Sequence, residues 1–158
     1  MDLDIRPATE SDAGLLFSLI VELAEYEKLA DEVSGDAEVL HRSLFEQHAA
    51  EALIVELDGE AIGYAIFFTN FSTFECRSGI WLEDVYVRPE RRRGGIGRKV
   101  MEHLAALALE RGHVRLEWCA LDWNEPALRF YDKLGATRLD DWRMIRLDRD
   151  GMRRLGES

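Results

Sequence analysis

The turn at residues 88–98, with sequence RPERRRGGIGR, combines five arginines and three glycines in a chain that is otherwise acidic. Glycine lets successive main-chain N–H groups point into one concavity, which suits an anion. A helical pattern follows the turn, and the N-terminal end of a helix also attracts negative charge. Arginine side chains can add bidentate contacts to phosphate oxygens. We therefore predict that the turn binds a pyrophosphate group; the alternative is a solvated basic turn.

Two other phosphate-binding motifs fit this turn less well. The spacing of Gly94, Gly95 and Gly97 does not match the G-x-G-x-x-G pattern of dinucleotide-binding folds. Lys99 is followed by Val100 rather than by the Ser or Thr that a Walker motif requires. The sequence therefore disfavours a nicotinamide-dinucleotide site and a P-loop.

An anion-binding turn of this kind requires a strand before it and a helix after it, and the sequence predicts both. Residues 80–87 form a β-prone run that ends before Pro89, and an apolar stripe at helical spacing extends from about residue 95 to Gly112. The other expected strands are at residues 3–9, 52–57, 61–71, 113–121 and 142–147, and the other expected helices are at residues 9–28, 36–49 and 124–135. This order predicts an α/β (α+β) fold with a mixed sheet and helices on both faces.

Local signals define several of the element ends. Asn124 and Gly135 are a typical N-cap and a typical terminal glycine of one helix. The remaining signals are a capping box of Thr9 with Asp12, a hairpin turn at residues 58–60 and a bulge at Gly63. No repeat or linker is evident, and the length of 158 residues predicts a single domain, residues 1–158.

Three segments in the same order and spacing resemble the GNAT superfamily of acetyl-CoA-dependent N-acetyltransferases. In the turn, Arg92, Gly95 and Gly97 match the superfamily pattern R/Q-x-x-G-x-G/A, although Arg93 stands where relatives often have a further glycine. LEDVYV before the turn and WNEPALRFYDKLGA after it are similar to the diamine and polyamine acetyltransferase branch. The resemblance covers nearly the whole chain. It implies the GNAT fold, with a mostly antiparallel sheet of about seven strands.

The resemblance also implies that acetyl-CoA is the acyl donor and that the strand before the turn binds its pantetheine arm. Asn124 is expected to cap its helix and to contact the cofactor as well. The residues expected to bind the cofactor are Val85, Tyr86, Val87, Arg92, Arg93, Gly94, Gly95, Ile96, Gly97, Arg98, Asn124, Ala127 and Tyr131.

Acetyl transfer to an amine requires a base, because an alkylamine with a pKa of about 10.4 is almost fully protonated at neutral pH. Glu83 is the predicted general base, since apolar neighbours in its strand are expected to remove it partly from water. Tyr131 is the predicted general acid, because a phenol can protonate a departing thiolate. The alternatives are that Glu83 is solvated and that Tyr131 only packs at the edge of the core.

Acidic residues near these positions could bind a cationic substrate. Asp84 is expected on the opposite sheet face from Glu83 if the strand is regular, and we assign it to substrate binding together with Glu83. Tyr26 and Glu27 at the end of the first helix are further candidates, and a solvated helix end is the alternative. A diamine, a polyamine or a lysine-like amine such as thialysine is the expected acceptor.

Composition limits the other classes of function. The formal net charge of −11 argues against a nucleic-acid binder, and no apolar run is long enough for a membrane span. Cys76 and Cys119 form no C-x-x-C motif, which favours a reducing cytoplasm. The four histidines are scattered, so no metal site is expected.

Two competing functions and the oligomeric state stay open in the sequence. A protein or peptide amine could be the acceptor, or the chain could be a CoA-binding regulator without turnover. The branch that it resembles implies a homodimer.

Overall fold

The computed structural model describes residues 1–157. The chain divides into two compact units, Met1–Leu121 and Asp122–Ser158, and each is described by itself.

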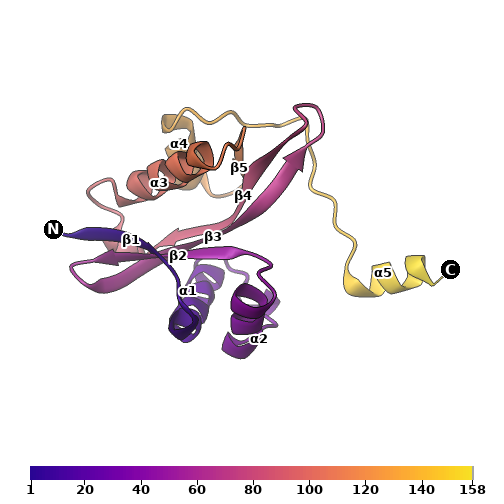
Figure 1. Ribbon diagram of the computed structural model, residues 1–158, viewed down its shortest axis with the longest axis horizontal. Coiled ribbons are helices and arrows are strands. Elements are labelled where there is room, and N and C mark those ends of the chain that lie inside the picture. The colour runs from indigo at the N-terminus through magenta and orange to yellow at the C-terminus, as the bar shows by residue number, and fades with distance from the viewer. Residues whose placement is uncertain (158) are drawn as a thin grey trace. The chain divides into compact units, whose positions relative to one another are not determined.

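The first unit is built on one twisted sheet (Figure 1), in which the strands lie in the order of the sequence. The first four strands pair antiparallel, and the last pairs parallel to its neighbour. The strands are β1 (Leu3–Pro7), β2 (Glu51–Leu57), β3 (Glu60–Ser72), β4 (Arg77–Val87) and β5 (Leu116–Trp118). The predicted mixed, mostly antiparallel sheet is confirmed, but it has five strands rather than about seven.

Turn chemistry explains the hairpin between β2 and β3. Asp58 and Gly59 between β2 and β3 both have positive φ, 52° and 81°, as the tight hairpin turn predicted here requires. The β2–β3 register then shifts between Val55 and Glu56, which confirms a bulge beside Gly63. A Cβ atom on Gly63 would lie 2.2 Å from the carbonyl oxygen of Tyr86 in β4, so only glycine allows this close approach of two strands.

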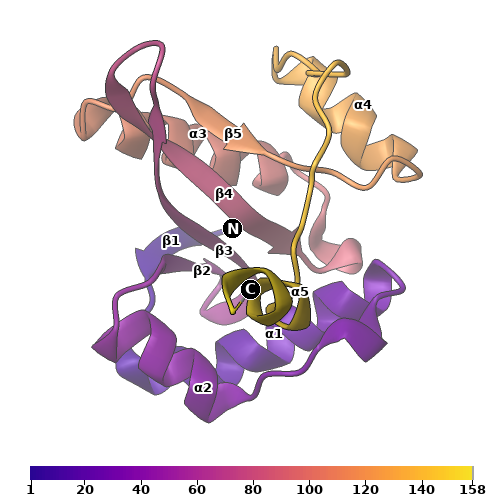
Figure 2. The ribbon, with the colours of Figure 1, turned by 90° about the vertical axis from the view of Figure 1, so that its right-hand side faces the viewer.

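Helices cover both faces of the sheet, as predicted (Figures 1 and 2). On one face lie α1 (Ala13–Tyr26) and α2 (Ala37–His41), which continues as a π-helical turn, η3 (Arg42–Glu46). On the other face lies α3 (Ile96–Glu110). Short 3₁₀ turns are η1 (Glu10–Asp12), η2 (Ala30–Glu32) and η4 (Pro89–Arg91).

The start of the first helical segment is fixed by polar contacts. The capping box of Thr9 with Asp12 is present, as predicted. The Asp12 carboxylate also accepts hydrogen bonds from Arg6 at 2.8 and 3.1 Å, and these bonds lower the pKa of Asp12 to about 2. The β1 strand and the helix that follows it are therefore joined by a charged pair.

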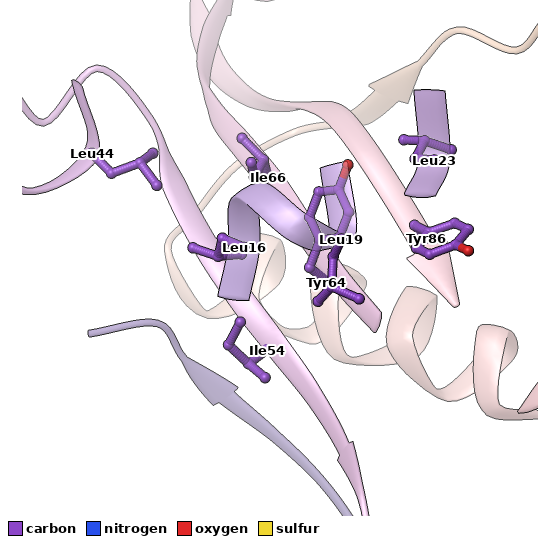
Figure 3. Close-up of a cluster of buried hydrophobic side chains, with 8 residues drawn as sticks. All are labelled: Leu16, Leu19, Leu23, Leu44, Ile54, Tyr64, Ile66 and Tyr86. Carbon is purple, nitrogen blue, oxygen red and sulfur yellow. The ribbon is translucent and has the colours of Figure 1, made fainter. Parts of the chain in front are cut away.

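The α1 face of the sheet holds a continuous apolar cluster (Figure 3). Leu16 and Leu19 of α1 are fully buried against aromatic and aliphatic side chains of the sheet. The cluster comprises Leu16, Leu19, Leu23, Leu44, Ile54, Tyr64, Ile66 and Tyr86. Its two tyrosines are direct neighbours across β3 and β4, so polar hydroxyl groups enter an otherwise apolar layer.

The second unit contains two helices, α4 (Glu125–Lys133) and α5 (Arg149–Gly156). Asn124 caps α4 as predicted, and Gly135 follows it with a φ of 87°. The predicted strand at residues 142–147 is wrong, because this segment has no regular structure. Strand propensity needs a hydrogen-bonded neighbour to become a strand. The side chains of Trp142 and Ile145 are 77% and 90% exposed.

We predict that Gly63→Ala destabilises the first unit by about 3 kcal/mol, because the new methyl group would overlap a main-chain carbonyl of β4. Chemical denaturation measures the free energy of unfolding. Gly14→Ala is the matched control, since a Cβ there meets no atom within 4 Å and α1 gains a better helix former. Equal stability of the two variants would contradict this account of Gly63.

Candidate active site

The centre of β4 contains a bulge that decides the direction of its acidic side chains. Leu82 pairs with Phe67 and Asp84 pairs with Ile66, so Glu83 is the extra residue. Ile66 and Phe67 are adjacent and point to opposite faces, and directly paired residues share a face. Asp84 therefore lies with Ile66 on the face that packs against α1.

The carboxylate of Glu83 lies on the same face. Trp81 pairs with Phe68, two residues after Ile66, so its side chain is also on the α1 face. The indole Nε1 of Trp81 donates a hydrogen bond to Oε2 of Glu83 at 3.0 Å. The expectation that Asp84 points to the opposite face from Glu83 is wrong, because it assumed a regular strand. Glu83 is also exposed rather than surrounded by apolar side chains.

Asp84 is the half-buried member of this pair. Burial raises the pKa of Asp84 to about 6, and the negative charges of Glu83 and Glu27 add to this effect. The hydroxyl group of Tyr64 donates to Oδ2 of Asp84 at 3.1 Å and acts in the opposite direction. Asp84 thus changes its charge close to neutral pH.

The end of α1 brings a third carboxylate toward β4. Glu27 is the residue after α1, and burial raises its pKa. Its charge acts on both Asp84 and Tyr64. Glu27, Glu83 and Asp84 thus form an acidic group, which we call the carboxylate triplet. Such a group favours a ligand with positive charge.

Arg92 connects the end of α1 with the turn after β4. Its Nε donates to the main-chain oxygen of Val87 at 2.8 Å. Its guanidinium carbon lies 4.4 Å from the ring centre of Tyr26 and 5.8 Å from that of Tyr86. These are cation–π distances, so Tyr26 is held by the same arginine that shapes the turn.

Most of the other arginines in the turn bind glutamates of the protein itself. The pairs are Arg88–Glu22 at 2.9 Å, Arg91–Glu60 at 2.8 Å and Arg98–Glu102 at 2.8 Å. Arg88 binds both oxygens of Glu22 and lowers the pKa of that carboxyl group. Three of the five arginines therefore pair with glutamates of the protein and help to hold the turn in place.

The main chain of the turn has the geometry of an anion site. Gly94 and Gly95 have φ values of 73° and 75°, which side chains other than glycine rarely adopt. Gly95 is the N-cap of α3, and the first hydrogen bond of the helix runs from Lys99 N to Gly95 O. The N–H groups of the first helical turn, Ile96 to Arg98, have no acceptor within the helix.

β4 and β5 separate just before this turn. Their pairing ends at Leu82 and Trp118, whereas β4 continues for five more residues to Val87. Val85, Tyr86 and Val87 pair with β3 along their other edge. Within the described part of the chain, β5 therefore pairs with no residue of β4 between the bulge and the turn.

The remaining predicted site residues lie in the second unit. Asn124 accepts a hydrogen bond from the main-chain N–H of Ala127 at 3.4 Å, which satisfies its role as a cap. Tyr131 follows on α4, with its ring centre 5.4 Å from that of Phe130.

Comparison with known proteins places this arrangement in a family. Residues 18–136 match the Acetyltransferase (GNAT) family. The chain is 39% identical to thialysine N-epsilon-acetyltransferase of Bos taurus, covering 96% of this chain and 95% of that protein. It is 36% identical to the enzyme of that name in Caenorhabditis elegans, covering 93% and 92%.

The chain belongs to the GNAT family of acetyltransferases. The fold agrees, since an integron cassette protein from the mobile metagenome of V. cholerae superimposes with a TM-score of 0.83. That comparison covers 100% of this chain and 99% of the other, at 23% identity.

Sequence reasoning missed two residues that contact the carboxylate triplet. Tyr64 and Trp81 each donate a hydrogen bond to one carboxylate of the triplet. Both lie in apolar strand patterns, where an aromatic residue is ordinarily read as core. Neither contact could be predicted without the register of β3 and β4 and the bulge at Glu83. Within residues 1–157, no cluster of His, Cys, Asp and Glu suited to a metal occurs, and no helix could cross a membrane.

We predict that Asp84→Asn removes a pH dependence of stability. The folded protein holds the Asp84 proton up to a pKa of about 6, above the ordinary value of 3.8, so ionisation of Asp84 destabilises the fold as the pH rises through this window. The variant should therefore gain about 3 kcal/mol in unfolding free energy over the unmodified protein between about pH 4 and pH 8. Urea denaturation across this range measures the difference.

The control is Asp4→Asn, an exposed position on β1. Its difference from the unmodified protein should stay constant with pH. A constant difference for Asp84→Asn as well would contradict the environment described for Asp84.

Proposed function

We propose that this chain transfers the acetyl group of acetyl-CoA to a primary amine of a small cationic substrate. A diamine, a polyamine or a lysine-like amine such as thialysine is the expected acceptor. The observation that carries the proposal is the bulge in β4, which turns Glu83 and Asp84 to one face beside Glu27. The thialysine acetyltransferases similar to this chain support the same class of acceptor.

The residues present fit the cofactor. Glycines with positive φ and the N–H groups at the start of α3 suit the pyrophosphate, and a Cβ at Gly95 would meet no atom within 4 Å. We assign the pyrophosphate to Arg93, Gly94, Gly95 and the first turn of α3, with Arg92 holding the turn in shape. The main chain of residues 85–87 would bind the pantetheine arm. When bound, acetyl-CoA supplies a thioester whose acyl group can be transferred.

The carboxylates have distinct roles in this proposal. Glu83 is exposed and held by Trp81, so it can take the proton from the attacking amine directly or through a water molecule. Asp84 and Glu27 bind positive charge on the substrate, and Tyr26 lies beside Glu27 at the end of α1. Such charge pairing would contribute both affinity and orientation.

Tyr131 remains the proposed proton donor to the leaving thiolate, with Asn124 and Ala127 as proposed cofactor contacts on α4. These assignments rest on the resemblance of residues 123–136 to the diamine and polyamine branch. The phenol chemistry is suitable, because a phenol can transfer a proton to a thiolate as the C–S bond breaks.

We further propose that the chain is a cytoplasmic homodimer that binds neither nucleic acid nor membrane. Its net charge is −11, and Cys76 and Cys119 are both free thiols. The second unit exposes a run of large apolar side chains: Leu139, Trp142, Met144, Ile145 and Leu147. Exposed apolar segments of this size ordinarily mark a surface that another chain covers.

We predict that Glu83→Gln lowers kcat with a diamine or thialysine by about 100-fold or more, because the amide cannot accept the proton. Thiol release with a panel of diamines, lysine analogues and peptides measures turnover, and calorimetry measures acetyl-CoA binding. Glu51→Gln is the control, since Glu51 pairs with Arg111 at the start of β2 and should leave kcat unchanged. Turnover of peptides alone would sink the small-amine acceptor, and a Glu83→Gln kcat within about twofold of the unmodified protein would sink the general base.

We predict that Ile145→Glu converts a dimer into a monomer, because a charge placed in a covered apolar surface is strongly unfavourable. Sedimentation equilibrium measures the mass in solution. Leu109→Glu on α3 changes a residue that is 77% exposed and should leave the dimer intact. A monomeric unmodified protein would refute the dimer.

A further inference from the structure

Tyr64 is a fully buried tyrosine whose hydroxyl group donates a hydrogen bond to Asp84. Its side chain is 0% exposed, and its ring lies in the apolar α1 cluster beside Tyr86 (Figure 3). A phenylalanine would fill the same apolar space. The hydroxyl group is compensated by its hydrogen bond to Oδ2 of Asp84 at 3.1 Å. The buried hydroxyl group of Tyr64 therefore binds this one carboxylate.

That carboxylate has unfavourable electrostatic surroundings. The groups that face Asp84 are the Tyr64 hydroxyl from β3, Glu83 from its own strand and Glu27 from the end of α1. Two of these three carry negative charge and oppose the ionised form. The Tyr64 hydroxyl favours the ionised form of Asp84, because a donor stabilises a carboxylate more than a carboxylic acid.

The hydrogen bond also fixes the direction of the group. It uses Oδ2 and ties the carboxylate to the hydroxyl group of a fully buried ring. Oδ1 can then accept a hydrogen bond from an ammonium group. A carboxylate with both oxygens free to rotate would lose conformational entropy when such a ligand binds.

We propose that Tyr64 is a positioning residue that holds the Asp84 carboxylate ready to receive the positive charge of the amine substrate. This inference rests on the proposed function, and it adds a residue that touches neither substrate nor cofactor. Tyr64 acts through Asp84 alone. Its effect should therefore be confined to amine binding and should disappear when Asp84 cannot ionise.

The test uses Tyr64→Phe in the full chain, with steady-state kinetics from about pH 5.5 to pH 8.5. KM for the amine should rise about tenfold at the acidic end, whereas kcat and KM for acetyl-CoA should stay within about twofold. The KM ratio of variant to unmodified protein should fall as the pH rises, because Asp84 is then ionised in both. In an Asp84→Asn background, Tyr64→Phe should leave KM unchanged.

The matched control is Ile54→Val, which trims a fully buried residue of the same cluster and has no polar contact to Asp84. It should lower stability slightly and leave the KM profile unaltered. A tenfold KM increase that persists in the Asp84→Asn background would show a purely structural effect and overturn the proposal. So would an unchanged KM.

A direct titration separates this proposal from the proposed function. Carbon-detected NMR of the Asp84 carboxyl should show a higher pKa in Tyr64→Phe than in the unmodified protein. If no amine is turned over, the proposed function fails, and the titration still decides whether Tyr64 controls the charge of Asp84. An identical Asp84 titration in both proteins would overturn the role of Tyr64.

Discussion

One extra residue in β4 is the constraint on which the proposed acceptor site depends. Glu83 has no partner on β3. Leu82 therefore lies with Phe67 on one face of the sheet, and Asp84 lies with Ile66 on the α1 face. A regular strand would place the two acids on opposite faces and leave Asp84 directed toward α3. The same bulge lies next to the point where β4 leaves β5, so the acidic face and the open strand edge arise together.

The glycine-rich turn, the helix caps and most strands could be predicted from sequence because their signals are local. The φ values of Asp58, Gly59, Gly94 and Gly95 follow from residue type. Register across strands is not local, so the bulge at Glu83 and the contact of Tyr64 with Asp84 could not be predicted. The missing strand at residues 142–147 has the same cause, since an alternating apolar pattern forms a strand only beside a partner.

The arginines of the turn have partners that charge density alone does not indicate. Five arginines suggested a set of phosphate ligands, but Arg88, Arg91 and Arg98 pair with glutamates that are distant or one helical turn away. Three glutamates of the chain are thus paired where its positive charge is concentrated. In the proposed site, anion binding would then depend mainly on backbone N–H groups, whose direction is set by the glycines.

The contact of Arg92 with Tyr26 has a thermodynamic consequence. One guanidinium group holds the carbonyl of Val87 and the ring that precedes Glu27. In the proposed site, a donor that orders the turn would also restrict Tyr26 through Arg92, so the acceptor would lose less conformational entropy when it binds. In the proposed site, the affinities for donor and acceptor would then be linked, and by reciprocity each ligand would change the affinity for the other by the same factor.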